Sequence, residues 1–226
     1  MNKVLLNPFY VVQTKAGKNT NDINKIFGIP KGVPDEKWPK RENNYMHHLI
    51  TIDVRKLTLP ESIKADIITI FYYPVKKVDG KQPDPFEAVY LEFNDRYLKD
   101  LPRHPKEYNP QKTNNANNDV VTNGVQFDQQ QIKEISQKQI SESLVNQETS
   151  ELPQPLAKLR GMNSFIGGFP MWLQEPNTPK AKDGSDAFYL FMLNGFTDYT
   201  KSTPFEGVDL FIFLDKTGKV YSVAQT

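Results

Sequence analysis

Cysteine is absent from all 226 residues of the chain. This absence excludes disulfide bonds, thiolate metal ligands and a cysteine nucleophile. The chain also lacks a large excess of positive or negative charge, since it has 28 Lys and Arg residues and 27 Asp and Glu residues, and no long run of either sign occurs. Nucleic acids and anionic membranes are bound by clustered basic charge, so the sequence predicts neither as a partner.

Long hydrophobic runs are missing as well. The first residues contain no apolar stretch of signal-peptide length, and no later run is long enough to span a membrane. We therefore expect a cytoplasmic protein without membrane association.

Residues that perform chemistry are few. His47 and His48 are adjacent, and neighbours on a strand point to opposite faces, so the pair is poorly placed to share one metal ion. His104, the third histidine, lies in a proline-rich stretch. No serine sits in a Gly-x-Ser-x-Gly elbow, and no phosphate-binding glycine pattern occurs. The sequence predicts no catalytic residue, no metal and no cofactor, and thus a protein that is not an enzyme.

Runs of β-branched and aromatic residues predict strands at 9–13, 49–54, 67–73 and 88–93, and again at 188–193 and 208–214. The last two are continuously apolar and bounded by glycines, which is typical of strands buried on both faces. Residues 215–219 then predict a hairpin turn, with Gly218 at positive φ, into a strand at 220–223.

Residues 102–155 differ in composition from the rest of the chain. They are rich in Asn, Gln, Ser and Lys, with too little apolar surface to offset the cost of ordering them. Within this polar insertion, an apolar stripe over residues 128–147 predicts one amphipathic helix with Asp128 as its N-cap. We expect this helix to pack on the sheets. The alternative is a helix that binds a partner.

One short phrase is written twice. Ile-Phe-Gly-Ile-Pro at residues 26–30 returns as Ile-Gly-Gly-Phe-Pro at 166–170, and Trp38 or Trp172 follows each copy. Two strand-like runs come next in both, with 49–54 aligned to 189–194 and 67–72 to 209–214. The glycine and proline predict a tight turn, and the tryptophan is expected to close one end of the core.

The shared order indicates an internal duplication. The sequence therefore predicts an α+β fold with two related, mainly antiparallel sheet-containing halves, residues 1–101 and 156–226, joined by the insertion at 102–155 with its helix.

These segments carry a family resemblance. Residues 28–34, Trp38, residues 49–54 and the stretch Gly-Gly-Phe-Pro-Met-Trp-Leu-Gln at 167–174 resemble the YwqG-like family, a bacterial domain of unknown function. The resemblance implies an α+β fold with two related halves. Because members are often found near polymorphic toxin genes, it also implies an immunity or accessory role. Phe27 departs from the family, which usually has glycine there, and no catalytic residue carries over.

Three functional hypotheses follow. The first is a protein-binding module, specifically an immunity protein that blocks a cognate toxin through an interface of standard size. The alternative is an enzyme or small-molecule binder that uses an aromatic-lined cleft between the halves, with Trp172, Gln174, His47 and Asp53. A structural or regulatory protein without a toxin is the third.

Two groups of residues are candidate contacts for a partner or ligand. Aromatic and amide side chains would line the cleft, and carboxylates around the last strands would present a negative patch. A core position for the tryptophans and turn capping for the carboxylates are the structural alternatives. The candidates are Trp38, Tyr45, Trp172, Gln174, Asp198, Glu206 and Asp209.

Overall fold

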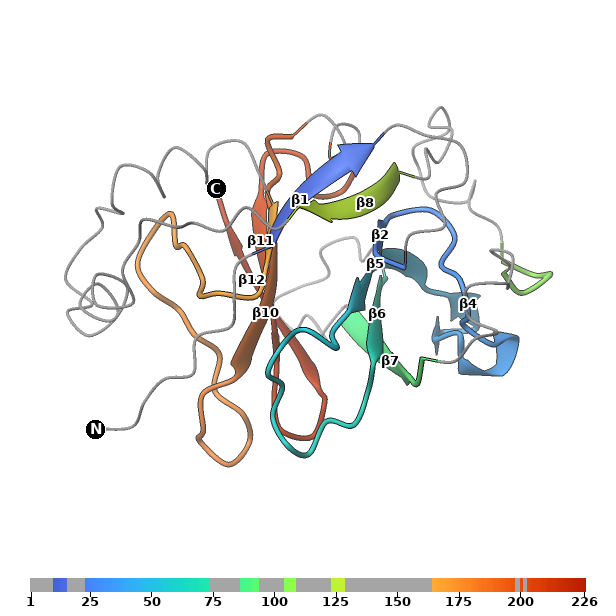
Figure 1. Cartoon of the computed structure of the whole chain (residues 1–226), viewed down its shortest axis with the longest axis horizontal. Helices are drawn as coiled ribbons and strands as arrows, with labels where there is room; N and C mark the ends of the chain where they lie inside the picture. The colour runs from blue at the N-terminus through green and yellow to red at the C-terminus, as the bar shows by residue number, and fades with distance from the viewer. Residues whose placement is uncertain are drawn as a thin grey trace. The chain divides into compact units, whose positions relative to one another are not determined.

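The computed structural model describes residues 10–15, 23–73, 86–93, 104–108, 123–128, 164–197, 200 and 203–226. The chain divides into two compact units. Unit 1 comprises residues 1–13, 127–214 and 222–226, and unit 2 comprises residues 14–126 and 215–221. Figure 1 labels most strands of both.

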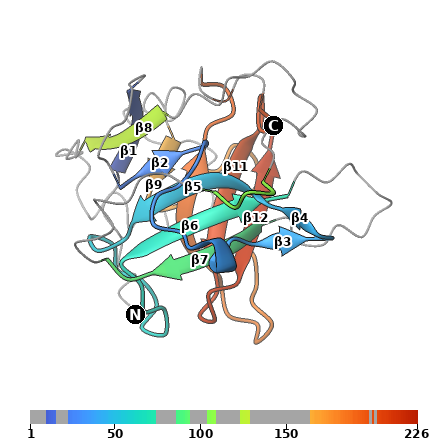
Figure 2. The ribbon, with the colours of Figure 1, turned by 90° about the vertical axis from the view of Figure 1, so that its right-hand side faces the viewer.

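Unit 2 is built on antiparallel strands. Its strands lie in the order β8, β2, β5, β6, β7, and β5, β6 and β7 are adjacent in Figure 2. A 3₁₀ helix, η1, precedes a short hairpin of β3 and β4. The bounds are β2 (Lys25–Ile26), η1 (Asp35–Lys37), β3 (Lys40–Arg41), β4 (Asn44–Tyr45), β5 (His47–Asp53), β6 (Ile67–Tyr72), β7 (Phe86–Leu91) and β8 (Asn123–Asp128).

Unit 1 has the strand order β12, β11, β10, β9, β1. The pairings of β9 with β1, of β9 with β10 and of β10 with β11 are antiparallel. Every residue of β11 is buried, and in β10 only Phe188 is partly exposed. The prediction that these two apolar runs are fully buried strands is thus confirmed. The bounds are β1 (Tyr10–Lys15), β9 (Ser164–Ile166), β10 (Phe188–Leu193), β11 (Asp209–Leu214) and β12 (Val220–Gln225).

The predicted α+β class is wrong. Strands dominate the described residues, and no α-helix occurs among them. The α component of the prediction depended on the amphipathic helix at 128–147. Asp128, its expected N-cap, is instead the last residue of β8, and the rest of that segment lies outside the described residues. An apolar stripe is weak evidence when the segment that carries it is mostly polar.

The repeated phrase forms the same turn in each unit. Phe27 and Gly28 have φ values of 56° and 73°, and Gly167 and Gly168 have φ values of 73° and 69°. Two consecutive residues of positive φ bend the chain directly after β2 and after β9, and glycine is favoured there because it lacks a Cβ. Phe27, which stands where the second copy has Gly167, therefore occupies a conformation that disfavours its side chain.

A matching bulge accompanies each turn. The register of β5 with β6 shifts between His48 and Ile50, and that of β10 with β11 shifts between Tyr189 and Phe191. The extra residues in the two bulges are Leu49 and Leu190, so residue 49 corresponds to residue 190. The sequence alignment of residues 49–54 with 189–194 was therefore one residue out of register, because a sequence comparison does not show which residue forms a bulge.

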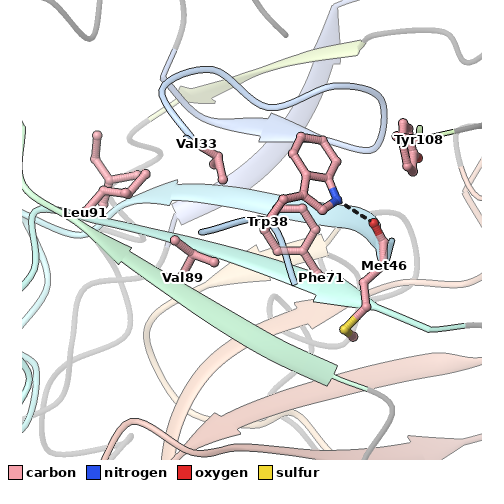
Figure 3. Close-up of a cluster of buried hydrophobic side chains, with 8 residues drawn as sticks. Val33, Trp38, Met46, Phe71, Val89, Leu91 and Tyr108 are labelled. Atoms are coloured by element: carbon pink, nitrogen blue, oxygen red, sulfur yellow. Dashed lines mark hydrogen bonds between the residues drawn. The ribbon is translucent and has the colours of Figure 1, made fainter. Parts of the chain in front are cut away.

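The core of unit 2 is an aromatic and aliphatic cluster, drawn in Figure 3. Trp38 is 3% exposed, and its indole Nε1–H donates to the carbonyl oxygen of Met46 at 2.8 Å. Its ring lies 5.0 Å from the ring of Phe71 and 5.2 Å from that of Tyr108. The prediction that this tryptophan belongs to the core is confirmed. The buried members are Val33, Trp38, Met46, Ile67, Phe71, Val89, Leu91 and Tyr108.

Candidate functional site

A pocket of about 620 Å³ opens on unit 2. Its walls come from three short segments, namely η1, the β3–β4 hairpin and residues 105–107. Five of its eight lining residues are charged, which is unusual for an apolar small-molecule site. The lining residues are Asp35, Glu36, Trp38, Lys40, Tyr45, Pro105, Lys106 and Glu107.

Tyr45 connects two walls of this pocket. Its hydroxyl donates to Oε2 of Glu107 at 3.2 Å, and the Lys40 ammonium lies 4.1 Å from the centre of its ring. The hydrogen bond that the Lys40 ammonium donates to Tyr45, with a smaller effect from the nearby Glu107 carboxylate, raises the pKa of Lys40. The tyrosine is thus held in place by a cation on its face and an acceptor at its tip.

Tyr108 anchors the third wall. Its hydroxyl lies 3.0 Å from Nδ1 of His47, and its ring lies within 5.5 Å of the His47 and His104 rings. Burial lowers the pKa of His47 and raises the pKa of Tyr108 to about 12. A neutral imidazole beside a neutral phenol fixes the segment that carries Glu107. A phenol of such high pKa is a poor nucleophile near neutral pH.

His48 points to the other side of β5 and is fully enclosed. Its Nδ1 lies 3.1 Å from the Phe27 carbonyl, and its Nε2 lies 2.9 Å from Oγ1 of Thr51. Burial, with a smaller effect from Lys25, lowers the pKa of His48 to about 3. The ring is therefore neutral and holds the repeated turn in place.

Lys25 fastens the same turn from the side. Its ammonium donates to the carbonyl oxygen of Ile29 at 2.6 Å. Burial and the neighbouring Lys31 lower its pKa to about 8. The shift reflects a structural role, because the ammonium bonds to the backbone of the turn and does not line the pocket.

Two of the predicted contact residues meet in the pocket. Trp38 and Tyr45 both line it, although Trp38 is otherwise a core residue. Trp172 and Gln174 belong to unit 1. The Trp172 ring packs on Phe211 and Phe213, with centroids 4.7 and 5.8 Å away. Gln174 is exposed, and its side chain donates to the backbone oxygen of Thr226. The cleft between the halves stays a prediction.

The predicted acidic patch is not assembled by the described residues. Asp209 is 2% exposed, and its Oδ1 accepts the backbone N–H of Gly195 at 3.2 Å. Glu206 is exposed, and Asp198 lies outside the described residues. Asp209 therefore acts within the fold, as the structural alternative proposed.

Asp53 is also occupied locally. It forms an ion pair with Arg55 at 2.7 Å. Burial acts to raise the pKa of Asp53, but the hydrogen bonds from Arg55 outweigh it and leave the pKa below its usual value. Asp53 thus caps the end of β5 and has no feature of a catalytic acid.

Sequence reasoning missed most of the pocket. Asp35, Glu36, Lys40, Lys106 and Glu107 are charged residues on short segments, and each resembles an ordinary solvated side chain. The aromatic residues at 38, 45 and 108 were the only available signal, since buried tyrosines and tryptophans often have their polar atoms directed at a surface. That signal identified Trp38 and Tyr45 but not Tyr108.

No family model matches the sequence, and no curated protein matches it. The resemblance to the YwqG-like family gains no support from these comparisons and stays a prediction. Within the described ranges, no three His, Asp or Glu side chains form a group that could hold a metal ion. No helix in that part of the chain is long and apolar enough to cross a membrane.

Proposed function

We propose that this protein is a protein-binding module, that it acts in the cytoplasm as an immunity protein against a cognate toxin, and that the unit 2 pocket is its contact site. The observation that carries the proposal is the fixed position of Tyr45 at the pocket wall, between the Lys40 ammonium and the Glu107 carboxylate. Protein interfaces combine rigid aromatic anchors with a charged rim, and a prearranged anchor loses little entropy on binding.

The toxin as partner comes from the YwqG-like resemblance alone. The pocket supports the broader part of the proposal, which is binding to a protein. The near-zero net charge fits a partner that is not strongly basic.

Capture from the native cell tests this function. The tagged full chain is expected to retain one stoichiometric protein whose expression alone kills the host. Tyr45→Ala should reduce capture at least about tenfold, because aromatic anchors dominate interface energies. Phe196→Ala is the matched control, since Phe196 is 64% exposed and belongs to unit 1. Equal capture by Tyr45→Ala and wild type, or loss only with Phe196→Ala, would exclude the pocket as the contact site.

A second candidate function is binding of a small molecule. The volume of about 620 Å³ lies within the range of ligand pockets, about 300 to 1,000 Å³. Native mass spectrometry of the purified chain distinguishes the two. A retained metabolite that Tyr45→Ala releases, with no protein captured, would favour the small-molecule function.

A further inference from the structure

The pocket contains carboxylates that its own residues do not neutralise. Asp35 and Glu36 are exposed on η1, and within the described residues neither side chain forms an ion pair or a hydrogen bond. Glu107 accepts one hydrogen bond, from Tyr45. Three carboxylates therefore line one hollow of about 620 Å³.

The two lysines of the pocket differ in their surroundings. Lys40 lies over the Tyr45 ring, and its charge is directed at that ring and at Glu107. Lys106 lies on the same short segment as Glu107. On the η1 side, Asp35 and Glu36 line the pocket, whereas Lys37, the third residue of η1, is not among the lining residues. The charge there is complementary to a cation.

Aromatic residues lie beside these carboxylates. Trp38 follows η1 directly and lines the pocket together with Tyr45. Indole and phenol rings attract cations through their faces, and this attraction adds to that of nearby carboxylates. A planar guanidinium fits such a site best, because it pairs with carboxylates through two N–H groups and stacks on aromatic rings.

We propose that the pocket receives an arginine or lysine side chain of the protein partner, with its cation between the η1 carboxylates and the aromatic wall. This inference rests on the proposed function and names the chemistry that the partner presents. One inserted side chain does not require a strongly basic partner, so it agrees with the near-zero net charge of the chain.

Nuclear magnetic resonance of the full chain tests the inference. The probe is N-acetyl-arginine-N-methylamide, and the corresponding glutamate compound is the control of opposite charge. The chain has two tryptophans, so two indole N–H signals are expected, and Trp172, which packs on Phe211 in unit 1, is the internal reference. The arginine probe should shift the Trp38 signal in a saturable way and leave Trp172 unchanged. The glutamate probe should shift neither.

The double variant Asp35→Asn with Glu36→Gln should weaken binding of the arginine probe by about fivefold, since exposed charge pairs contribute modestly to binding. Asp186→Asn removes an exposed carboxylate of unit 1 and should change nothing. Equal shifts with both probes, no saturable shift of Trp38, or unchanged affinity in the double variant would overturn the inference. If Tyr45→Ala loses the captured partner but the full chain does not respond to the arginine probe, the pocket is supported as the docking site and its preference for a cation is refuted.

Discussion

The carbonyl oxygens of Leu49 and Leu190 accept equivalent hydrogen bonds in the two units. Leu49 accepts the N–H of Phe27 at 2.8 Å, and Leu190 accepts the N–H of Gly167 at 2.9 Å. Both leucines are fully buried bulge residues, and both donors are left-handed residues of the repeated turn. The bulge thus exposes one strand carbonyl to the turn, and this bond fixes where the chain leaves the sheet.

The units differ directly after this turn. In unit 2 the chain between Pro30 and Trp38 is long enough to form η1, which carries Asp35 and Glu36. In unit 1 only Met171 separates Pro170 from Trp172. The η1 wall of the pocket therefore lies on a segment of unit 2 that unit 1 lacks, and the repeated turn itself serves the fold.

Gly195 should tolerate a side chain less well than Gly184. A Cβ at residue 195 would collide with the backbone of Val208 and of Phe205. A Cβ at residue 184 meets nothing within 4 Å, so an alanine there is strained only by the backbone φ of 81°. We expect Gly184→Ala to lower the free energy of unfolding by about 1 kcal/mol and Gly195→Ala by about 3 kcal/mol. Urea denaturation measures both. Equal losses would contradict the close approach at Gly195.

Trp38→Ala should destabilise the protein more than Trp172→Ala. Trp38 is 3% exposed and would leave a cavity beside Phe71, so we expect a loss of about 3 to 5 kcal/mol. Trp172 is only partly buried, and its removal should cost about half as much. Thermal and urea unfolding of both variants give the comparison. Unchanged unfolding of Trp38→Ala would show that this residue is not part of the core.

His48 should make stability fall between pH 6.5 and pH 3. Its pKa is about 3 in the folded protein and about 6.5 in the unfolded chain, so only the unfolded state gains a proton in this window. Protonation of this histidine in the unfolded chain lowers the free energy of unfolding by about 2 kcal/mol between pH 6.5 and pH 5.

Replacing this histidine should flatten the pH profile. His48→Gln is expected to be less stable than wild type at pH 7 and to lose less of its remaining stability on going to pH 5. The pKa of His47 is also lowered, so a part of the dependence should persist. Carboxylates of lowered pKa, such as Asp53, also reduce stability when they are protonated, but only at lower pH than the histidines. Parallel profiles of variant and wild type would argue against a neutral buried His48.

The long strands were predictable because their apolar runs are dense in β-branched and aromatic residues. Strand β10 has the predicted bounds, and β6 and β11 differ from them by one residue. The turn before β12 was also predictable, and Gly218 has the expected positive φ of 84°. Strands such as β2 and β4 were missed because two residues carry no period, and tertiary pairing alone defines them.

The candidate site was predictable only through its aromatic residues. Trp38 and Tyr45 stood out in the sequence, whereas Glu107 gains its place from the hydrogen bond with Tyr45, a partner 62 positions away. Asp209 shows the opposite error. It was a candidate for a surface patch, but it is buried, and its carboxylate accepts the backbone N–H of Gly195. Neither outcome follows from local sequence, because burial and long-range pairing determine both.

Amide hydrogen exchange of the full chain, with and without its captured partner, tests the central claim most directly. Backbone amides at residues 35–45 and 104–108, which form the pocket walls, are predicted to exchange more slowly in the complex. Residues 172–174 and 194–197 of unit 1 serve as the reference and should exchange at unchanged rates. Protection of these unit 1 residues without protection at 35–45 and 104–108 would contradict docking at the unit 2 pocket.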